Sequence, residues 1–308
     1  MSTRTQAALL IDTHHPLPEP LIPDGTPKET DTTALQAAIA AWERSGRPDS
    51  LGDLEAFLDQ HPQSAWSLAL QANLGILCAS QAQFGKALDW LERTFVAGEV
   101  ATAVNLRRLM DRVLGELLHL HARLGSVESL DRWLQEADRR ALQGSAFQYR
   151  SEARMALWSL RNQTGVAHRC GAAAVKEVLL AQDGKPAQAL LKTLESARSG
   201  PEGMTLADLE RLAGEAGLTL QAFRRVDPQA EIPVPSVVHW QVGHFGTLLA
   251  FQNGKYLLRD SVYPQERWIH GDILRQEGSG YFLLPEAVPG FEGLDTAQKA
   301  RLFVRLSG

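Results

Sequence analysis

A cysteine and a histidine–aspartate pair are the residues of this 308-residue chain whose types and spacing could support chemistry. Cys170 opens the run C-G-A-A-A-V-K-E-V-L-L, whose apolar residues recur every three to four positions, which predicts a helix. Unpaired backbone N–H groups and the helix dipole favour an anion in a first helical turn, so this position favours a thiolate. Arg169 and His168 would add positive charge beside it. We therefore expect Cys170 to be a nucleophile.

A nucleophilic cysteine needs a base and a group that orients the base. Short strands are predicted at 245–251 and 255–259, joined by Asn253-Gly254, a dipeptide typical of hairpin turns. His244 stands at the start of the first strand and Asp260 follows the end of the second. Because an antiparallel hairpin brings these two ends side by side, we expect His244 to be the base and Asp260 its orienting partner.

Several ordered motifs in this region are similar to those of one peptidase family. They are the C-G-x-A sequence at Cys170, the H-F pair at His244 after P-x-x-x-H-W, and Asp260 at the end of the next strand. Together they resemble the bacteriocin-leader peptidases, which are papain-like domains of transporters that cut after a double glycine. The resemblance covers roughly residues 160–286. It implies a papain-like fold, a Cys-His-Asp triad and cleavage after small residues such as glycine.

The resemblance also implies a glutamine six positions before the cysteine, whose amide helps to form the oxyanion hole. Thr164 occupies that position here, and Gln163 lies one residue earlier. The family has an acidic residue directly before the cysteine, where this chain has Arg169, and a proline after the aspartate, where it has Ser261. We expect Gln163 to serve as the oxyanion donor, and the departures leave the choice of substrate open.

Two residues shortly before the expected base, His239 and Trp240, are expected to line the substrate cleft. His239 also competes for the role of base, although His244 matches the H-F pattern. A zinc site that used both histidines would lack further clustered ligands, so neither a metal nor a cofactor is expected. The other cysteine, Cys78, lies in an apolar stretch of a predicted helix and is expected to be core.

The elements around these residues divide the chain into four predicted segments: an extended or disordered leader (1–29), a helical-repeat domain (30–160), a papain-like domain (161–288) and a tail (289–308). The predicted fold class is therefore α+β. An all-α, tetratricopeptide-like solenoid precedes a papain-like domain that contains an antiparallel sheet.

The helical segment shows an internal repeat. The string W-S-L-A-L-Q-A-N-L-G-I-L…F-G-K-A-L-D-W-L-E resembles a tetratricopeptide repeat, with helices at 66–79 and 86–95. Such helix pairs are expected to stack and to recruit the protein substrate. A capping-box pattern predicts that the first helix begins at Thr33, and Thr205 is predicted to cap a later helix. A terminal helix is predicted at 296–306.

Composition excludes several other classes of protein. The net charge of −5 gives no electrostatic reason to expect nucleic acid or an anionic membrane as a partner. No apolar run is long enough for a membrane span. Two cysteines in different predicted domains favour a reducing compartment, so a cytoplasmic location is expected, with export by a signal-independent route left open.

These features predict a cysteine endopeptidase that acts on a protein or peptide substrate, either cis-linked or encoded by a neighbouring gene. Repeats joined to a peptidase also resemble the N-terminal part of bacterial YD-repeat (RHS-like) proteins. Two alternatives stay open. The chain could be a catalytically silent peptidase-like binding module, or a chaperone for a secreted partner. The same residues could also transfer the acyl group to an amine instead of water.

Overall fold

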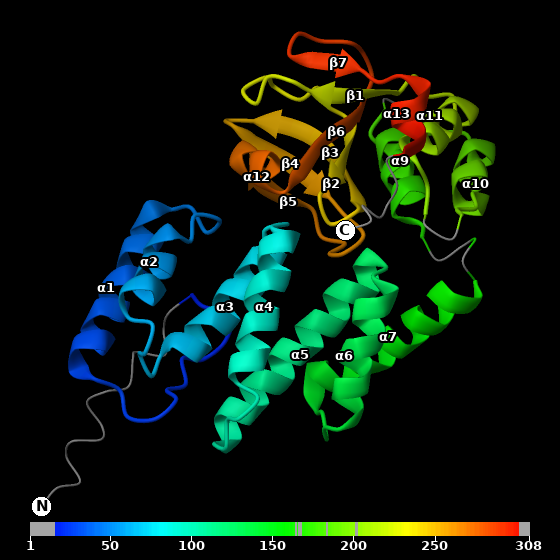
Figure 1. The fold of residues 1–308 in the computed structure, drawn as a ribbon. Coiled ribbons are helices and arrows are strands. Elements are labelled where there is room, and N and C mark those ends of the chain that lie inside the picture. Colours follow the sequence, from blue (N-terminus) through cyan, green and yellow to red (C-terminus); the bar gives the residue numbers. More distant parts are fainter. Residues whose placement is uncertain (1–15, 164, 166–167, 183, 201–202, 302–308) are drawn as a thin grey trace, which may run out of the picture. The chain divides into compact units, whose positions relative to one another are not determined.

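The computed structural model describes residues 16–163, 165, 168–182, 184–200 and 203–301. Helices fill the first half of the described chain, and an antiparallel sheet with further helices fills the second (Figure 1). The chain forms two compact units, one made of Met1–His119 with Trp133–Arg150 and the other of Leu120–Arg132 with Ser151–Gly308. The predicted α+β class is confirmed. The domain boundaries and the type of helical repeat stay predictions.

The helices before Cys170 follow one another with short turns. They are α1 (Glu29–Ser45), α2 (Gly52–Gln60), α3 (Ser67–Ser80), α4 (Phe84–Ala97), α5 (Val104–Leu124), α6 (Val127–Asp138) and α7 (Gly144–Asn162). The predicted pair of helices around the first repeat is present as α3 and α4, which pack side by side (Figure 1). Gly75 permits this approach, because a Cβ there would lie 2.6 Å from Cγ of Leu91.

The start of α1 differs from the sequence prediction. The helix begins at Glu29, so the predicted start at Thr33, one turn later, was wrong. Glu29 and Asp31 place negative charge in the first turn, where it stabilises the positive end of the helix dipole. A tertiary contact holds the same turn, since Nε1 of Trp66 donates to Oγ1 of Thr32 at 3.0 Å. The extra turn depends on a partner that is distant in sequence.

The second unit contains the remaining described elements. Its helices are α9 (Cys170–Leu180), α10 (Gln188–Ser196), α11 (Leu206–Glu215), α12 (Gly271–Gln276) and α13 (Thr296–Arg301). Its strands are β1 (Gln221–Arg225), β2 (Ser236–Trp240), β3 (His244–Gln252), β4 (Lys255–Arg259), β5 (Arg267–His270), β6 (Gly278–Leu284) and β7 (Phe291–Gly293). The predicted cap at Thr205 is confirmed, because its side chain and that of Asp208 form a capping box. The part of the predicted terminal helix at 302–306 lies outside the described residues.

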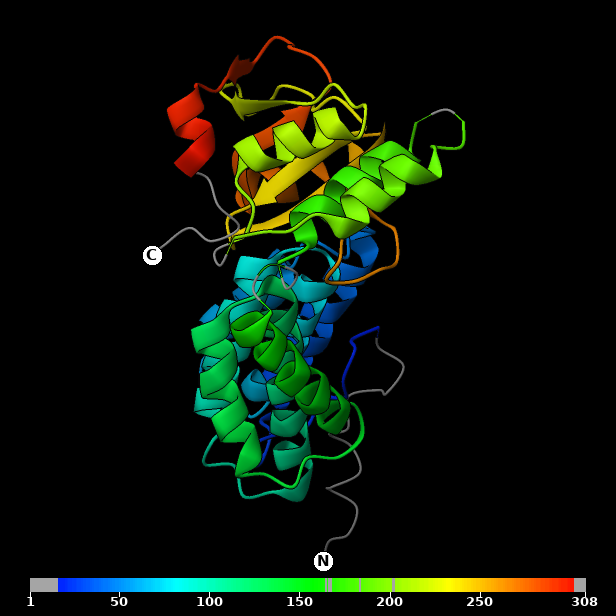
Figure 2. The ribbon, with the colours of Figure 1, turned by 90° about the vertical axis from the view of Figure 1, so that its right-hand side faces the viewer.

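The strands form one antiparallel sheet in the order β5-β4-β3-β2-β6-β1-β7. Helices α9, α10 and α11 lie together against one face of it (Figure 2), and α12 lies on the other side (Figure 1). The core between α9 and the sheet contains Val175 and Val178 of the helix and Phe245 of β3. This packing fixes the start of α9, and therefore Cys170, beside β3.

The hairpin that carries the histidine and the aspartate forms as predicted. Asn253 and Gly254 make the turn between β3 and β4, and both have positive φ angles, 51° and 76°. In the register of the hairpin, Thr247 pairs with Arg259. Asp260, one residue further, therefore lies close to the start of β3.

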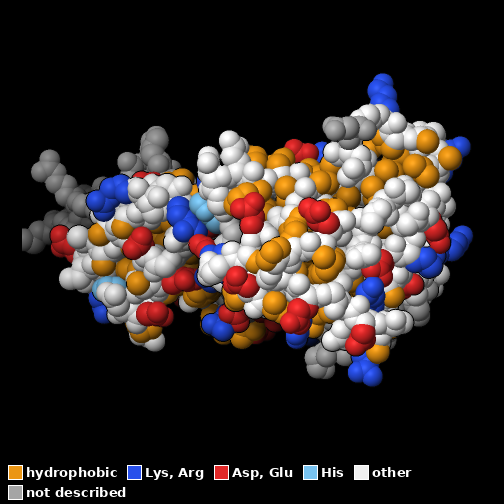
Figure 3. Space-filling model, turned by 90° about the horizontal axis from the view of Figure 1, so that it is seen from above, with side chains coloured by type: hydrophobic (Ala, Val, Ile, Leu, Met, Phe, Trp, Pro, Cys, Tyr) orange, Lys and Arg blue, Asp and Glu red, His pale blue; other side chains and the backbone are white. Residues whose placement is uncertain are grey.

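Charged side chains are mixed on the surface that Figure 3 shows. Acidic and basic groups are interspersed on this face, in agreement with the small net charge of −5 for the whole chain. Within the described residues, no helix is both long enough and apolar enough to cross a membrane.

Candidate active site

Cys170 is the first residue of α9 and is 8% exposed. The preceding residue, Arg169, makes no side-chain hydrogen bond to the first turn of the helix. Its guanidinium instead donates to the carbonyl oxygen of Glu195 at 2.7 Å. The Arg169 side chain therefore does not cap the backbone N–H groups in the first turn of α9. Such a helix start favours negative charge.

His244 and Asp260 form a buried hydrogen-bonded pair. Nε2 of His244 donates to Oδ1 of Asp260 at 3.0 Å, and both side chains are fully buried. The same Oδ1 accepts a hydrogen bond from the backbone N–H of Val262 at 2.7 Å. Because Asp260 takes Nε2, Nδ1 is the ring nitrogen left for Cys170, whose charge raises the pKa of the ring. The structure thus brings the three residues expected to form a triad into one group.

The charges in this group support one another. Burial is the largest effect on His244 and lowers its pKa, but the negative charges of Asp260 and Cys170 outweigh burial and raise the pKa to about 10. Burial alone would raise the pKa of Asp260. The charge of His244, the hydrogen bonds from His244 and Val262, and the charge of Arg267 instead lower it. This arrangement favours a protonated His244 ring beside an ionised Asp260 carboxylate.

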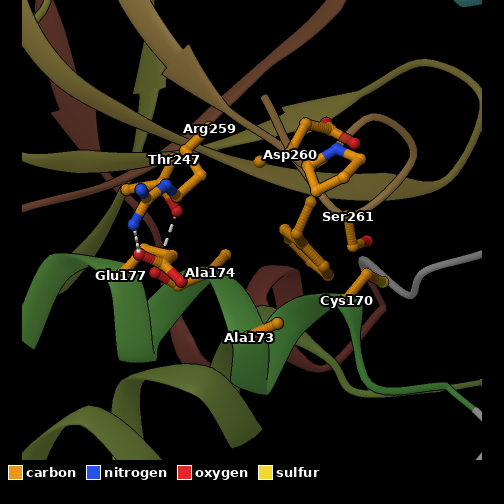
Figure 4. A pocket seen from close by; sticks show the side chains of 11 residues that line it. Cys170, Ala173, Ala174, Glu177, Thr247, Arg259, Asp260 and Ser261 are labelled. Carbon is orange, nitrogen blue, oxygen red and sulfur yellow. Dashed lines mark hydrogen bonds and ion pairs between the residues drawn. The ribbon is translucent and has the colours of Figure 1, made fainter. Parts of the chain in front are cut away.

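A hollow of about 230 Å³ opens beside the sulfur of Cys170. It lies between α9 and the hairpin, with Cys170 at one end and a pair of charged residues at the other (Figure 4). Ala173 and Ala174 form the helical wall, and their short side chains leave the hollow open. At the far end, Arg259 donates to Glu177 at 2.5 Å. The hollow is therefore lined by short and polar side chains near Cys170 and by an ion pair at the far end.

A second hollow, of about 200 Å³, also contains Cys170. It is lined by residues of the second unit alone, among them Gly125, His168, Arg169 and Ser261. His168 is buried there, and a Cβ on Gly125 would lie 3.0 Å from its ring. Since both hollows contain Cys170, an extended chain could pass the sulfur with segments on either side.

The other predicted site residues do not line either hollow, although Trp240 pairs with His244 across β2 and β3. Gln163 is exposed, and its amide oxygen accepts a hydrogen bond from Ser159 at 3.4 Å. His239 and Trp240 are completely buried within β2, and neither lines a hollow that contains Cys170. Nδ1 of His239 instead lies 2.8 Å from Oγ of Ser279. Their roles as oxyanion donor and substrate contacts stay predictions.

Some residues at the site were not singled out from the sequence. Thr247 ties the sheet to the helix, because its Oγ1 donates to the carbonyl oxygen of Ala174 at 2.9 Å. Gly246 leaves room for the aspartate, since a Cβ there would lie 2.9 Å from Oδ2 of Asp260. A signal was available for Glu177, which follows Cys170 by seven residues and so shares its helix face. Nothing comparable identified Arg259 as its partner.

Comparisons with known proteins point to one kind of relative. No protein-family model matches the chain. A stretch of 106 residues is 28% identical to the probable microcin-H47 secretion/processing ATP-binding protein MchF of Escherichia coli. The match covers 33% of this chain but only 14% of that protein. Among solved structures, a double glycine motif protease from an AMS/PCAT transporter, in complex with its leader peptide, aligns with 41% of this chain and 84% of its own, at 21% identity and a TM-score of 0.29. The chain is thus similar over part of its length to a protein named for secretion and processing.

Proposed function

We propose that this chain is a cysteine endopeptidase that hydrolyses a peptide bond in a protein or leader-peptide substrate. The observation that carries the proposal is the buried His244–Asp260 pair on the hairpin, which packs against the helix that Cys170 begins. A nucleophile at a helix start, a base within reach and an orienting carboxylate are the parts that acyl transfer requires. The partial similarity to a microcin secretion/processing protein supports the same activity.

In the proposed mechanism, the Cys170 thiolate attacks the carbonyl carbon of the scissile bond. The His244 imidazolium gives its proton to the leaving amine, and the C–N bond breaks. Neutral His244 then takes a proton from water, which attacks the thioester and releases the acid. Asp260 holds the ring and stabilises its positive charge. The backbone N–H of Cys170 would stabilise the oxyanion, joined by Gln163 once its amide leaves Ser159.

Small residues, in particular glycine, are proposed to precede the cut. Each hollow at Cys170 is only about 200–230 Å³ in volume. The first is lined by Ala173, Ala174 and Gly246. The helical part, which we take to be a tetratricopeptide-like repeat, is proposed to recruit the protein substrate. That substrate is either linked in cis or encoded nearby.

Selective alkylation tests the proposal. Iodoacetamide at neutral pH is expected to modify Cys170 much faster than Cys78, because only Cys170 lies beside an imidazolium. Cys170 is 8% exposed and lines two hollows, whereas Cys78 is completely buried, so exposure also favours labelling of Cys170. The Cys170→Ala variant is the matched control for cleavage of fragments of neighbouring proteins, with new termini mapped by mass spectrometry. Equal, slow labelling of both cysteines would exclude an activated nucleophile.

A second candidate is a catalytically silent binding module built on a peptidase-like fold. The observation that favours it is the position of Gln163, whose amide is bonded to Ser159 on α7. Without a side-chain donor, the oxyanion would depend on backbone groups alone. This candidate predicts slow labelling of Cys170 together with tight binding of an uncut peptide.

A further inference from the structure

The first unit contains a large basic cavity, which we call the arginine cavity. Its volume is about 970 Å³, at the upper end of the range of roughly 300–1,000 Å³ for ligand pockets. Arginines reach it from α5 and from the segment that follows α6: Arg107, Arg108, Arg112, Arg139 and Arg140. Two acidic residues also line it, Glu19 and Asp111. The lining therefore carries a positive excess in a chain whose net charge is −5.

Part of this positive charge is already neutralised. Arg140 pairs with Glu136 at 3.0 Å and with Asp111 at 3.3 Å. Among the residues that the structure describes, neither Arg107 nor Arg108 has an ion pair, and both are exposed. These two guanidinium groups are therefore free to bind carboxylates of another molecule.

The structure also shows a peptide carboxylate seated in the cavity. Glu19 belongs to a proline-containing segment without helix or strand structure, and its carboxylate accepts a hydrogen bond from Nε of Arg112 at 2.8 Å. Its backbone N–H donates to Oδ1 of Asn73 at 2.8 Å. Two residues earlier, Leu17 is buried. The first unit thus binds this segment of the chain both through its backbone and through an acidic side chain.

We propose that the arginine cavity binds an acidic peptide segment of the substrate, with Arg107 and Arg108 holding carboxylates beyond the place of Glu19. The proposal rests on the proposed function only in calling this peptide a substrate. A peptide is favoured over nucleic acid because the group seated in the cavity is a peptide carboxylate. In addition, none of the described lining residues is aromatic, so the cavity lacks the aromatic platform on which single-stranded bases usually stack.

Fluorescence anisotropy with the full chain tests this inference. The probe is a labelled peptide with residues 16–25 of this chain preceded by two glutamates, and its isosteric control has every acid replaced by its amide. The protein carries Cys170→Ala so that the peptide is not cut. We expect the acidic peptide to bind, and the Arg107→Glu/Arg108→Glu variant to bind it about tenfold more weakly or worse. Glu19→Gln should strengthen binding, because it removes one of the two carboxylates, Glu19 and Glu116, that pair with Arg112.

Matched controls separate local charge from net charge and from folding. Lys28→Glu/Arg44→Glu changes the net charge equally at exposed positions outside the cavity and should bind the peptide like the parent. Urea unfolding of the Arg107→Glu/Arg108→Glu and Lys28→Glu/Arg44→Glu variants should match that of the parent, since the replaced side chains are exposed. Equal affinity for the acidic and amide peptides, or undiminished binding by Arg107→Glu/Arg108→Glu, would overturn the inference. Tight binding of a single-stranded oligonucleotide that displaces the peptide would do the same.

Failure of this inference and failure of the proposed function give different results. Binding is measured on Cys170→Ala, so it does not depend on catalysis. A chain that labels rapidly at Cys170 but ignores the acidic peptide is a peptidase without this recruitment site. A chain that binds the peptide through Arg107 and Arg108 but labels slowly at Cys170 retains the site without the enzyme.

Discussion

The side chain of His244 has no exposed surface, so its charge is set by its neighbours and not by water. Asp260 and Cys170 both favour the protonated ring, and together they reverse the effect of burial. A neutral ring in the same place could accept the proton of the thiol and so become the imidazolium that protonates a leaving amine. The proton of this one residue is therefore used in both halves of the proposed reaction.

The raised pKa of His244 leads to a pH prediction. With a pKa of about 10, the ring stays protonated through the neutral range and loses its proton only as the pH approaches 10. The NMR signals of the His244 ring should then change little between about pH 7 and 9. Asp260→Asn removes a charge that raises this pKa, so the ring should lose its proton at a lower pH. NMR titration of the ring in both proteins checks the prediction, and identical titrations would contradict it.

Gly246 allows the second prediction at this scale. In Gly246→Ala the new Cβ would lie 2.9 Å from Oδ2 of Asp260 and 3.0 Å from Nε1 of Trp240. We expect a loss of about 1–3 kcal/mol in the free energy of unfolding and slower alkylation of Cys170. Gly214→Ala is the control, because α11 has open space at that position and alanine favours helix by up to about 1 kcal/mol. Urea unfolding compares the two. Equal effects would show that the close contact is unimportant.

At the scale of elements, the site depends on how α9 is held against the hairpin. Arg259 of β4 and Glu177 of α9 form an ion pair, and Arg259 also pairs with Glu266 at 2.8 Å. Both partners of the first pair are partly exposed, so its contribution to stability is expected to be ~1 kcal/mol or less. The ion pair would instead align the site, because Asp260 directly follows Arg259 and Cys170 lies on the same helix as Glu177.

A double-mutant cycle tests this alignment. Glu177→Gln and Arg259→Gln are each expected to slow alkylation of Cys170 several-fold, while the double variant should be no slower than either single one. The unfolding free energy should change by ~1 kcal/mol or less in each case. The matched control is the exposed pair of Asp89 and Arg93, whose glutamine variants should leave Cys170 unaffected. Additive effects in the cycle would argue against a functional pair.

Elements with local signals could be predicted from the sequence. The turn at Asn253-Gly254 and the cap at Thr205 depend on neighbouring residues, and both are where the sequence placed them. The group of Cys170, His244 and Asp260 was predicted because the hairpin itself brings two of its members together. The start of α1 was missed because Trp66, a residue distant in sequence, stabilises its first turn.

Contacts between separate elements could not be read in the same way. Glu177 and Arg259 are 82 residues apart, and no periodic pattern connects a helix face with a strand end. The same holds for Glu19 and Arg112, which are 93 residues apart. Many other arginines and carboxylates could have paired equally well on the evidence of the sequence.

At the scale of the whole molecule, the division into two units predicts separable effects. Gly75→Ala should disturb only the first unit, because its Cβ would lie 2.6 Å from Leu91 of α4. We expect a loss of about 1–3 kcal/mol in the unfolding free energy of the helical part, with alkylation of Cys170 unchanged in the absence of urea. Urea unfolding followed by circular dichroism, together with the alkylation rate, checks this. A parallel fall in both would mean that the two units depend on each other.

The outer strands of the sheet are short, four residues in β5 and three in β7. Such edges present few unpaired backbone groups, so they are poor templates for a further strand. A bound chain would gain few hydrogen bonds by adding a strand to the edge of the sheet, a mode of binding in which backbone hydrogen bonds supply the affinity. Binding of such a chain would instead depend on side-chain contacts. For the same reason, an unfolded neighbouring chain would find few backbone groups with which to aggregate edge to edge.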